Sequence, residues 1–190
     1  METNLYDVLS QPASIVAPRL LGSILEREID GKLVRVKIVE TEAYDDTDAA
    51  SHSYKGKTPR TDVMFGKPGY LYVYFTYGMH YCCNVVTGSE GTGSAVLIRA
   101  VEPLDGTEIL EERRHRSGIE ATNGPAKLCQ ALGITKQLNG HNLSKSPLKL
   151  ILKEPLDPVH ITQTIRVGIS QAQEVPWRFY ITDNPFVSKP

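Results

Sequence analysis

Apolar and polar residues alternate most regularly in the segment Leu33–Tyr44. Its first apolar residues, Val34, Val36 and Ile38, are separated by basic side chains. A period of two is typical of a strand with one buried face, so we predict a strand over this segment. The same period places three further side chains on the apolar face, namely Glu40, Glu42 and Tyr44.

Other strands are predicted where aromatic and β-branched residues gather. Tyr70–Thr76 and His80–Thr87 are two such segments, and only Tyr77, Gly78 and Met79 connect them. We therefore predict a β-hairpin with a tyrosine at its tip. Further short strands are expected at Ser94–Val101, Leu148–Leu152, Ile165–Ile169 and Arg178–Ile181.

Three segments have helical patterns. They are Ala13–Leu25, which Pro18 interrupts, Gly106–Arg116, and Pro125–Leu132. The last has its proline in the first turn, Asn123 as a candidate cap and Gly133 as a stop signal. Because strands and helices do not alternate regularly, we expect the α+β class: one domain over residues 1–190, with a curved, mainly antiparallel sheet, surrounding helices and a protruding hairpin.

Length and composition fit this expectation. The chain has 190 residues, of which 41% are hydrophobic, enough for one sizeable core. No basic leader or bilayer-length apolar segment is evident, so we expect a cytoplasmic protein that does not bind membranes. Cys82 and Cys83 are adjacent and Cys129 is distant, a spacing that fits neither a disulfide framework nor a zinc site.

The net charge of −1 does not by itself favour a nucleic-acid-binding protein. The charge is, however, unevenly distributed. Residues 1–50 carry ten acidic and five basic side chains, whereas residues 51–100 carry two acidic and five basic ones. The five are Lys55, Lys57, Arg60, Lys67 and Arg99. This distribution permits a local surface that faces DNA.

The predicted strand that ends at Tyr44 carries candidate catalytic acids. A carboxylate on a buried face is costly unless it is paired or functional, and partial burial favours a general base. Glu40 and Glu42 both satisfy this description, and periodicity does not choose between them. The alternative is that both lie at a frayed strand end in solvent or in ordinary ion pairs.

Two further polar features have structural alternatives. Asp45, Asp46 and Asp48 precede His52, but the run lacks the glycine and distal glutamate of a calcium loop, so we predict a solvated loop, no metal and no cofactor. Arg99 lies in a strongly apolar strand and needs a buried partner. That partner is either a structural carboxylate such as Glu102 or a catalytic glutamate with which the arginine holds a water.

Aromatic residues are densest around the predicted hairpin. Tyr72 and Tyr74 share one strand face, where sheet packing is a sufficient explanation. Tyr77 has little core to enter at the tip, and a bulky ring there is suited to wedge between stacked bases.

Taken together, these motifs resemble the alkyladenine (3-methylpurine) DNA glycosylase family. Ordered matches run over nearly the whole chain and include IVETEAY at Ile38–Tyr44, DAASH at Asp48–His52, LYVYFTYGM at Leu71–Met79, VLIR at Val96–Arg99, GPAKLCQAL at Gly124–Leu132 and PWRFYI at Pro176–Ile181.

The resemblance implies a monomeric, nucleoid-associated DNA repair enzyme. Such an enzyme would flip alkylated or deaminated purines (3-methyladenine, 7-methylguanine, hypoxanthine and ethenoadenine) out of double-stranded DNA and hydrolyse the N-glycosidic bond. It would need no cofactor and would have no strand-cleaving lyase activity.

The resemblance also implies a role for each matched residue. Glu42 would be the general base and Arg99 would help it fix the attacking water, assisted by the backbone carbonyl of Val167. The flipped base would be bound by Tyr44, His52, Tyr74 and Asn84, and the DNA would be intercalated by Tyr77 with Met79 beside it. Glu40 would be structural.

Two departures from the family pattern concern the entrance of the pocket. Thr61 stands where the family usually has asparagine, and Asp45 and Asp46 occupy a loop that often carries glycine. A second class of function stays open, a non-catalytic nucleic-acid-binding module whose aromatic hairpin stacks on bases. A carbohydrate glycosidase is disfavoured, because carboxylates two residues apart on one strand do not flank a sugar.

Overall fold

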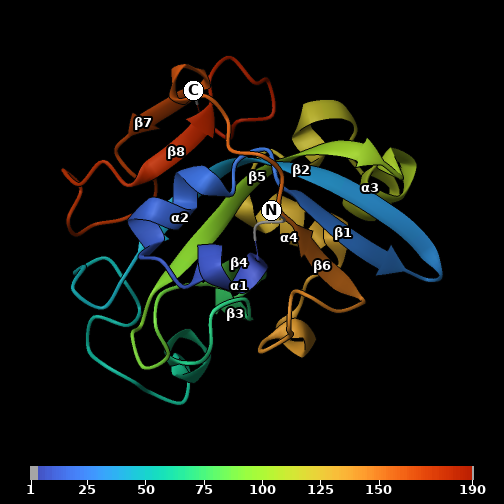
Figure 1. Ribbon diagram of the computed structural model, residues 1–190. Helices are drawn as coiled ribbons and strands as arrows, with labels where there is room; N and C mark the ends of the chain where they lie inside the picture. Colours follow the sequence, from blue (N-terminus) through green and yellow to red (C-terminus); the bar gives the residue numbers. More distant parts are fainter. Residues whose placement is uncertain (1–3, 190) are drawn as a thin grey trace.

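The computed structural model describes residues 4–189, which form a curled antiparallel sheet with helices packed around it (Figure 1). The strands are β1 (Ile24–Ile29), β2 (Lys32–Tyr44), β3 (Leu71–Thr76), β4 (His80–Val86), β5 (Ala95–Asp105), β6 (Leu148–Ile151), β7 (Ile161–Thr164) and β8 (Arg178–Ile181). The α-helices are α1 (Leu5–Leu9), α2 (Ala13–Arg19), α3 (Thr107–Arg114) and α4 (Pro125–Leu132). The α+β prediction is confirmed.

The long strand β2 organises the sheet. The order is β3-β4-β5-β2-β1-β6, and β8 pairs with both β2 and β7. One edge of β2 pairs with β5 over most of its length, while the other edge pairs first with β1 and then with β8. The end of β2 therefore lies between β5 and the β7–β8 hairpin, which Figure 1 shows beside the C-terminus.

A pair of β-bulges changes which face of β2 is apolar. Ile38 pairs with Val101 and Thr41 with Ile98, but between them Glu40 pairs with Ala100, which leaves one extra residue on each strand. A bulge redirects the side chains beyond it. The main core accordingly takes Val34, Val36 and Ile38 and then Ala43 from β2, and Val96, Ile98 and Val101 from β5.

This result corrects the prediction that the two glutamates continue the apolar face. Thr41, between them, points to the core, where its hydroxyl donates to the carbonyl oxygen of Ala17 at 2.9 Å. Glu40 and Glu42 lie on the opposite face, yet both are fully buried; Ser188 near the C-terminus donates to Glu40, and Val167 in the loop after β7 donates to Glu42. The bulges therefore separate the acid-bearing face from the apolar core.

The N-terminal helical prediction is too long. Helix α2 ends at Arg19, Gly22 takes a left-handed φ of 81°, and Ile24–Ile29 forms strand β1, which turns into β2 through Asp30 and Gly31. The residues of β1 are mostly apolar at its ends and charged in the middle, so periodicity alone does not distinguish it from a helix. Pairing with β2 and β6 decides its conformation.

Two other local predictions are wrong. Ile165–Ile169 is not a strand, because the pairing with β8 ends at Thr164 and the chain then turns toward the end of β2. Asn123 does not cap α4; Gly124 precedes the helix, and the Asn123 side chain accepts from Lys127 Nζ at 2.7 Å instead. Gly133 does end the helix, with a φ of 63°.

The three cysteines are buried and unpaired within the described part of the chain. Burial raises the pKa of the Cys82 thiol to about 11. A thiol is therefore the stable form at neutral pH. In residues 4–189, no helix is both long enough and apolar enough to cross a bilayer.

Candidate active site

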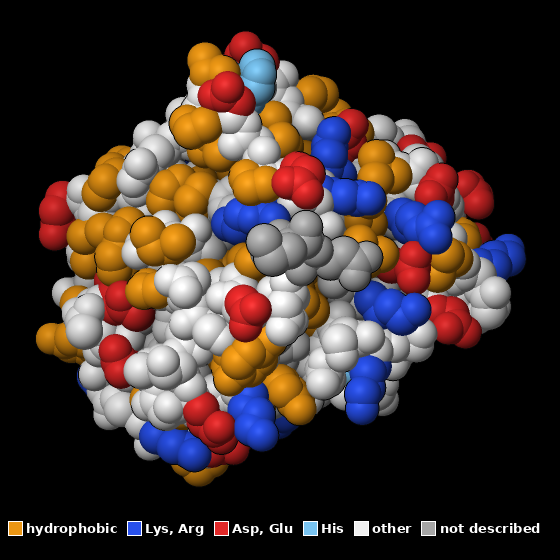
Figure 2. All heavy atoms as spheres, viewed as in Figure 1, with side chains coloured by type: hydrophobic (Ala, Val, Ile, Leu, Met, Phe, Trp, Pro, Cys, Tyr) orange, Lys and Arg blue, Asp and Glu red, His pale blue; other side chains and the backbone are white. Residues whose placement is uncertain are grey.

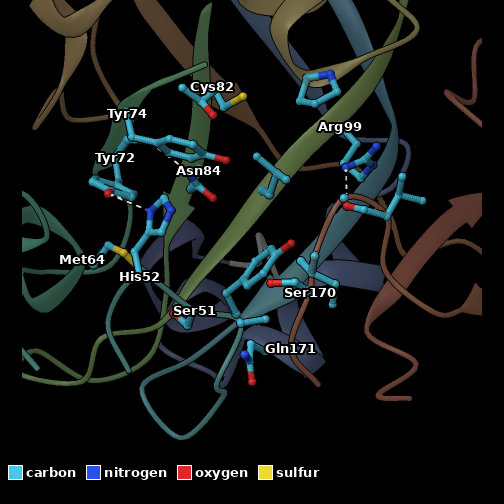
Figure 3. Close-up of a pocket in the computed structure, with 18 of the residues that line it drawn as sticks. Ser51, His52, Met64, Tyr72, Tyr74, Cys82, Asn84, Arg99, Ser170 and Gln171 are labelled. Atoms are coloured by element: carbon cyan, nitrogen blue, oxygen red, sulfur yellow. Dashed lines mark hydrogen bonds between the residues drawn. The ribbon is translucent and has the colours of Figure 1, made fainter. Parts of the chain in front are cut away.

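A cavity of about 410 Å³ opens beside the end of β2. Its walls come from β2, β3, β4, β5, the loop after β2 and the loop after β7. Figure 3 shows Tyr72, Tyr74 and His52 on one side of the cavity and Arg99 on the other. The remaining residues predicted to form the site and found in its lining are Tyr44, Asn84, Tyr77 and Val167.

Glu42 lies immediately behind the residues that line the cavity at the end of β2. Its Oε2 accepts from the Tyr44 hydroxyl at 2.7 Å and lies 3.4 Å from Arg99 Nη1, and its Oε1 accepts from the Val167 amide at 2.7 Å. The three residues that contact the carboxylate all line the cavity. A carboxylate has about four acceptor positions, so one remains for a further donor.

Tyr44 is held as a hydrogen-bond donor. Burial, followed by the charge of Glu42, raises the pKa of its hydroxyl far above the usual value. The hydroxyl therefore stays protonated at neutral pH, and its hydrogen bond orients Glu42. The Tyr44 hydroxyl contacts Glu42, and Tyr44 also lines the cavity.

Arg99 connects the two glutamates. Its Nε donates to Glu40 Oε1 at 3.0 Å, and its Nη1 donates to the Val167 carbonyl oxygen at 3.4 Å, close to Glu42. Burial alone would lower the pKa of this guanidinium, but the charges of Glu42 and Glu40 raise it. The alternative partner, Glu102, is not bonded to Arg99.

Glu40 has a different set of partners from Glu42. Its Oε1 accepts from Arg178 Nε at 2.7 Å and from the Ser188 hydroxyl at 2.9 Å, and its Oε2 accepts from the Ser188 amide at 2.7 Å. Glu102 instead pairs with Lys37 at 2.6 Å. Glu40 therefore serves a buried structural cluster, and Glu42 is the acid next to the cavity.

The aromatic wall combines two tyrosines and a histidine. The rings of Tyr72 and Tyr74 are stacked with centroids 5.7 Å apart, and the His52 ring meets Tyr74 edge-on at 4.6 Å. His52 Nδ1 lies 3.1 Å from the Tyr72 hydroxyl, as Figure 3 shows, and Nε2 lies 3.5 Å from Arg60 Nη2. Because arginine only donates, Nε2 is the acceptor and Nδ1 carries the proton.

We predict that His52 stays neutral across the physiological range. Burial and then the charge of Arg60 lower its pKa from 6.5 to about 4. Between these values the unfolded chain binds more protons than the folded one, so this histidine makes the free energy of unfolding fall as the pH decreases through that window. An NMR titration should give a midpoint for His52 near 4, and a midpoint near 6.5 would contradict the prediction.

Asn84 lies at the buried end of the cavity. Its side-chain amide donates to the Tyr72 carbonyl oxygen at 3.3 Å, and the residue is 5% exposed. One amide hydrogen and the side-chain oxygen remain for another partner. The structure thus places Asn84 in the lining of the cavity, next to the aromatic wall.

The hairpin tip projects into solvent. Tyr77 is 82% exposed and Met79 is 68% exposed, although both have large apolar side chains. Tyr77 and Gly78 take left-handed φ values of 51° and 66°, which suits a tight turn between the two strands. Tyr77 reaches the rim of the cavity, whereas Met79 is not among the described residues that line it.

The prediction of a solvated loop for the acidic residues before His52 is only partly correct. Asp46 is exposed, as a solvated loop requires, but Asp48 is 6% exposed and pairs with Arg166. The prediction of a solvated loop is therefore wrong for Asp48. Sequence reasoning also missed Arg166, which belongs to the segment wrongly predicted as a strand. Among the described residues, no group of three histidine, cysteine or acidic side chains is arranged to hold a metal ion.

Four basic residues of the segment 51–100 are exposed, and one of them, Arg60, lies beside the cavity. Lys55, Lys57, Arg60 and Lys67 are exposed, and the Arg60 guanidinium lies 5.9 Å from the centre of the Tyr74 ring. On the face shown in Figure 2, by contrast, acidic and basic side chains are interspersed. Exposed cations beside an aromatic cavity are suited to bind phosphates that flank an inserted base.

Comparison with known proteins gives one consistent result. Residues 7–185 match the family described as methylpurine-DNA glycosylase (MPG). Relatives named "Putative 3-methyladenine DNA glycosylase" include proteins of Carboxydothermus hydrogenoformans (52% identical, 92% of this chain and 93% of the relative), Desulfitobacterium hafniense (48%, 92% of each) and Francisella tularensis (46%, 98% of each).

Proposed function

The chain belongs to the methylpurine-DNA glycosylase family, which makes it a DNA glycosylase that hydrolyses N-glycosidic bonds, and we propose that Glu42 performs the hydrolysis by activating water. The supporting observation is a buried carboxylate directly behind a cavity whose walls are aromatic. Residues 1–190 would act as a single glycosylase domain, as a monomer in the cytoplasm on double-stranded DNA. No cofactor is needed for this chemistry.

The substrate has to leave the base stack first. Extruding a nucleotide costs a few kcal/mol, and a damaged or mispaired base lowers that cost. The exposed ring of Tyr77 stands at the rim of the cavity, where it can occupy the space that the extruded nucleotide vacates. Met79, next to it on the same tip, would contact the minor groove.

The extruded base would stack between aromatic side chains. Tyr44, Tyr74 and His52 line the cavity, and electron-rich rings favour a purine that alkylation has made cationic. Asn84, which lies at the buried end of the cavity, would reject normal guanine by clashing with its 2-amino group. Thr61, 2% exposed and bonded within its own loop, shapes the entrance indirectly.

The hydrolytic step uses the remaining acceptor position of Glu42. A water that enters between Glu42, Arg99 and the Val167 carbonyl donates one proton to the carboxylate and directs its oxygen at the sugar carbon. As the bond to the purine breaks, the sugar approaches an oxocarbenium ion, which the negative charge of Glu42 stabilises. The water oxygen forms the new bond to the sugar carbon, its proton passes to Glu42, and the base departs with the bonding electrons.

The proposed product is an intact abasic strand. A lyase would need a nucleophilic amine near the sugar, and within the described part of the chain no lysine lines the cavity. Incubation with a duplex that contains 3-methyladenine or hypoxanthine should release the free base, and the strand should break only after alkaline treatment. Tight binding without base release would instead indicate a non-catalytic binding module.

We predict that Tyr77→Ser weakens lesion binding more than chemistry. Losing the ring removes the group that holds the duplex open, so affinity for a lesion duplex should fall by about tenfold or more, on the scale of one base-stacking contact. Excision from a single strand, where no space needs filling, should change little. Excision from a duplex at an unaltered rate and affinity would show that Tyr77 is not a wedge.

A further inference from the structure

A buried ion pair lies behind Tyr44. The Arg166 guanidinium donates to both carboxylate oxygens of Asp48, through Nη1 and, at 3.0 Å, through Nη2. It also donates to the carbonyl oxygens of Ala43 at 2.9 Å and Ala172 at 3.3 Å. The exposed fractions of the two charged side chains are 0% and 2%. The pair thus joins the loop after β2 to the loop after β7 away from solvent.

Arg166 covers the back of a ring that lines the cavity. Its guanidinium carbon lies 4.7 Å from the centre of the Tyr44 ring and 5.5 Å from that of Trp177. Tyr44 is among the residues that line the cavity, whereas Arg166 and Asp48 are not among the described ones that do. The cation therefore approaches the Tyr44 ring from outside the cavity.

Arg166 is charged in this position. Burial alone would lower its pKa, but the hydrogen bonds that Arg166 donates to Asp48 and the negative charge of that residue raise it. The carboxylate of Asp48 in turn compensates the positive charge next to the ring. With both partners ionised, the pair presents almost no net charge to Tyr44.

The charge balance between Arg166 and Asp48 affects a ligand that binds to the other face of the Tyr44 ring. A cation is attracted to the face of an aromatic ring, and a second cation on the opposite face opposes that attraction. The Arg166 guanidinium carbon is 4.7 Å from the ring centre, so a base stacked on the other face would lie within the screening length of about 10 Å, and the interior screens charges poorly. A neutral ligand at the same place does not experience this repulsion.

We infer that Asp48, by offsetting the positive charge of Arg166 behind Tyr44, preserves the preference of the cavity for cationic over neutral purines. The inference rests on the proposed function, in which the extruded base stacks on Tyr44. Arg166 and Asp48 act through the tyrosine and do not touch the base, so they are specificity-determining residues rather than catalytic ones.

Three variants test the inference. Asp48→Asn leaves the positive charge uncompensated, so the rate on 3-methyladenine, a cation in DNA, should fall about tenfold relative to the rate on neutral hypoxanthine. Arg166→Met leaves the negative charge, so the ratio should shift in the opposite direction. The double variant has neither charge and should return to the wild-type ratio.

The two lesions are supplied as differently labelled duplexes in one single-turnover reaction, so the fraction of folded enzyme cancels in the ratio. A purely structural role would lower both rates together and leave the ratio unchanged in all three variants, which would overturn the inference. If Asp48→Asn yields no folded protein, the inference still requires that the ratio of the two excision rates differ between Arg166→Met and the double variant. Failure of wild-type enzyme to release either base would instead refute the proposed function.

Discussion

Glu42→Gln is expected to slow base release from a 3-methyladenine duplex by a factor of about a hundred to ten thousand under single-turnover conditions. The amide keeps the shape of the side chain and can still accept from the Val167 amide, which donates to Glu42 at 2.7 Å. It has no negative charge to stabilise the sugar cation and is too weak a base to deprotonate water. The proposed chemistry is lost while the cavity remains.

Binding separates this explanation from misfolding. The cavity walls come from Tyr44, His52, Tyr74 and Asn84, none of which changes, so affinity for the lesion duplex should stay within a few-fold of wild type. Glu108→Gln, an exposed substitution in α3, is the matched control and should retain full activity. Equal rates for Glu42→Gln and wild type would refute the role of Glu42.

Glu40→Gln should have its largest effect on stability. Glu40 is fully buried and accepts from Arg99, Arg178 and Ser188. Removing one charge from a buried cluster leaves its partners uncompensated, at a cost of about 3–5 kcal/mol in the free energy of unfolding. The C-terminal segment that Ser188 belongs to should also lose its attachment.

Urea denaturation measures this effect. The matched control is Glu102→Gln, which removes a half-exposed ion pair with Lys37 and should cost about 1 kcal/mol or less. Similar decreases in the free energy of unfolding for the two variants would show that the Glu40 cluster stabilises the protein no more than a surface ion pair does.

Local patterns predicted most of the elements that build the site. The alternation in β2, the hairpin of β3 and β4, and the proline and glycine that bound α4 all depend on residues close in sequence, and the structure has each of them. The two glutamates were recognised because periodicity placed them on the face predicted to be buried, and they are buried, although on the opposite face. These features depend on local backbone preferences and on the pattern of apolar and polar residues along the chain.

Features that depend on contacts between distant segments were not predictable. The bulges that redirect Glu40 and Glu42 depend on the pairing of β2 with β5, which periodicity within β2 does not contain. Arg166 pairs with Asp48 across 118 positions of the chain, so neither residue indicates the other locally. Strand β1 was missed for the same reason.

The choice between the two glutamates illustrates the limit. Periodicity treats Glu40 and Glu42 alike, and resemblance to the family favours Glu42. In the structure they differ in their neighbours: Ser188 and Arg178 satisfy Glu40, whereas the partners of Glu42 line the cavity. The difference arises from the β7–β8 hairpin and the C-terminal segment, which fold over the sheet from far along the chain.

The central claim is that Glu42 activates water rather than attacking the sugar itself. The most direct test is excision in water that contains methanol, followed by the configuration of the methyl deoxyriboside formed at the abasic position. A solvent molecule activated by Glu42 attacks the face opposite the departing base, so the account predicts the inverted, α-configured product. A β-configured product would mean that the configuration is retained through a covalent intermediate, and it would contradict the account.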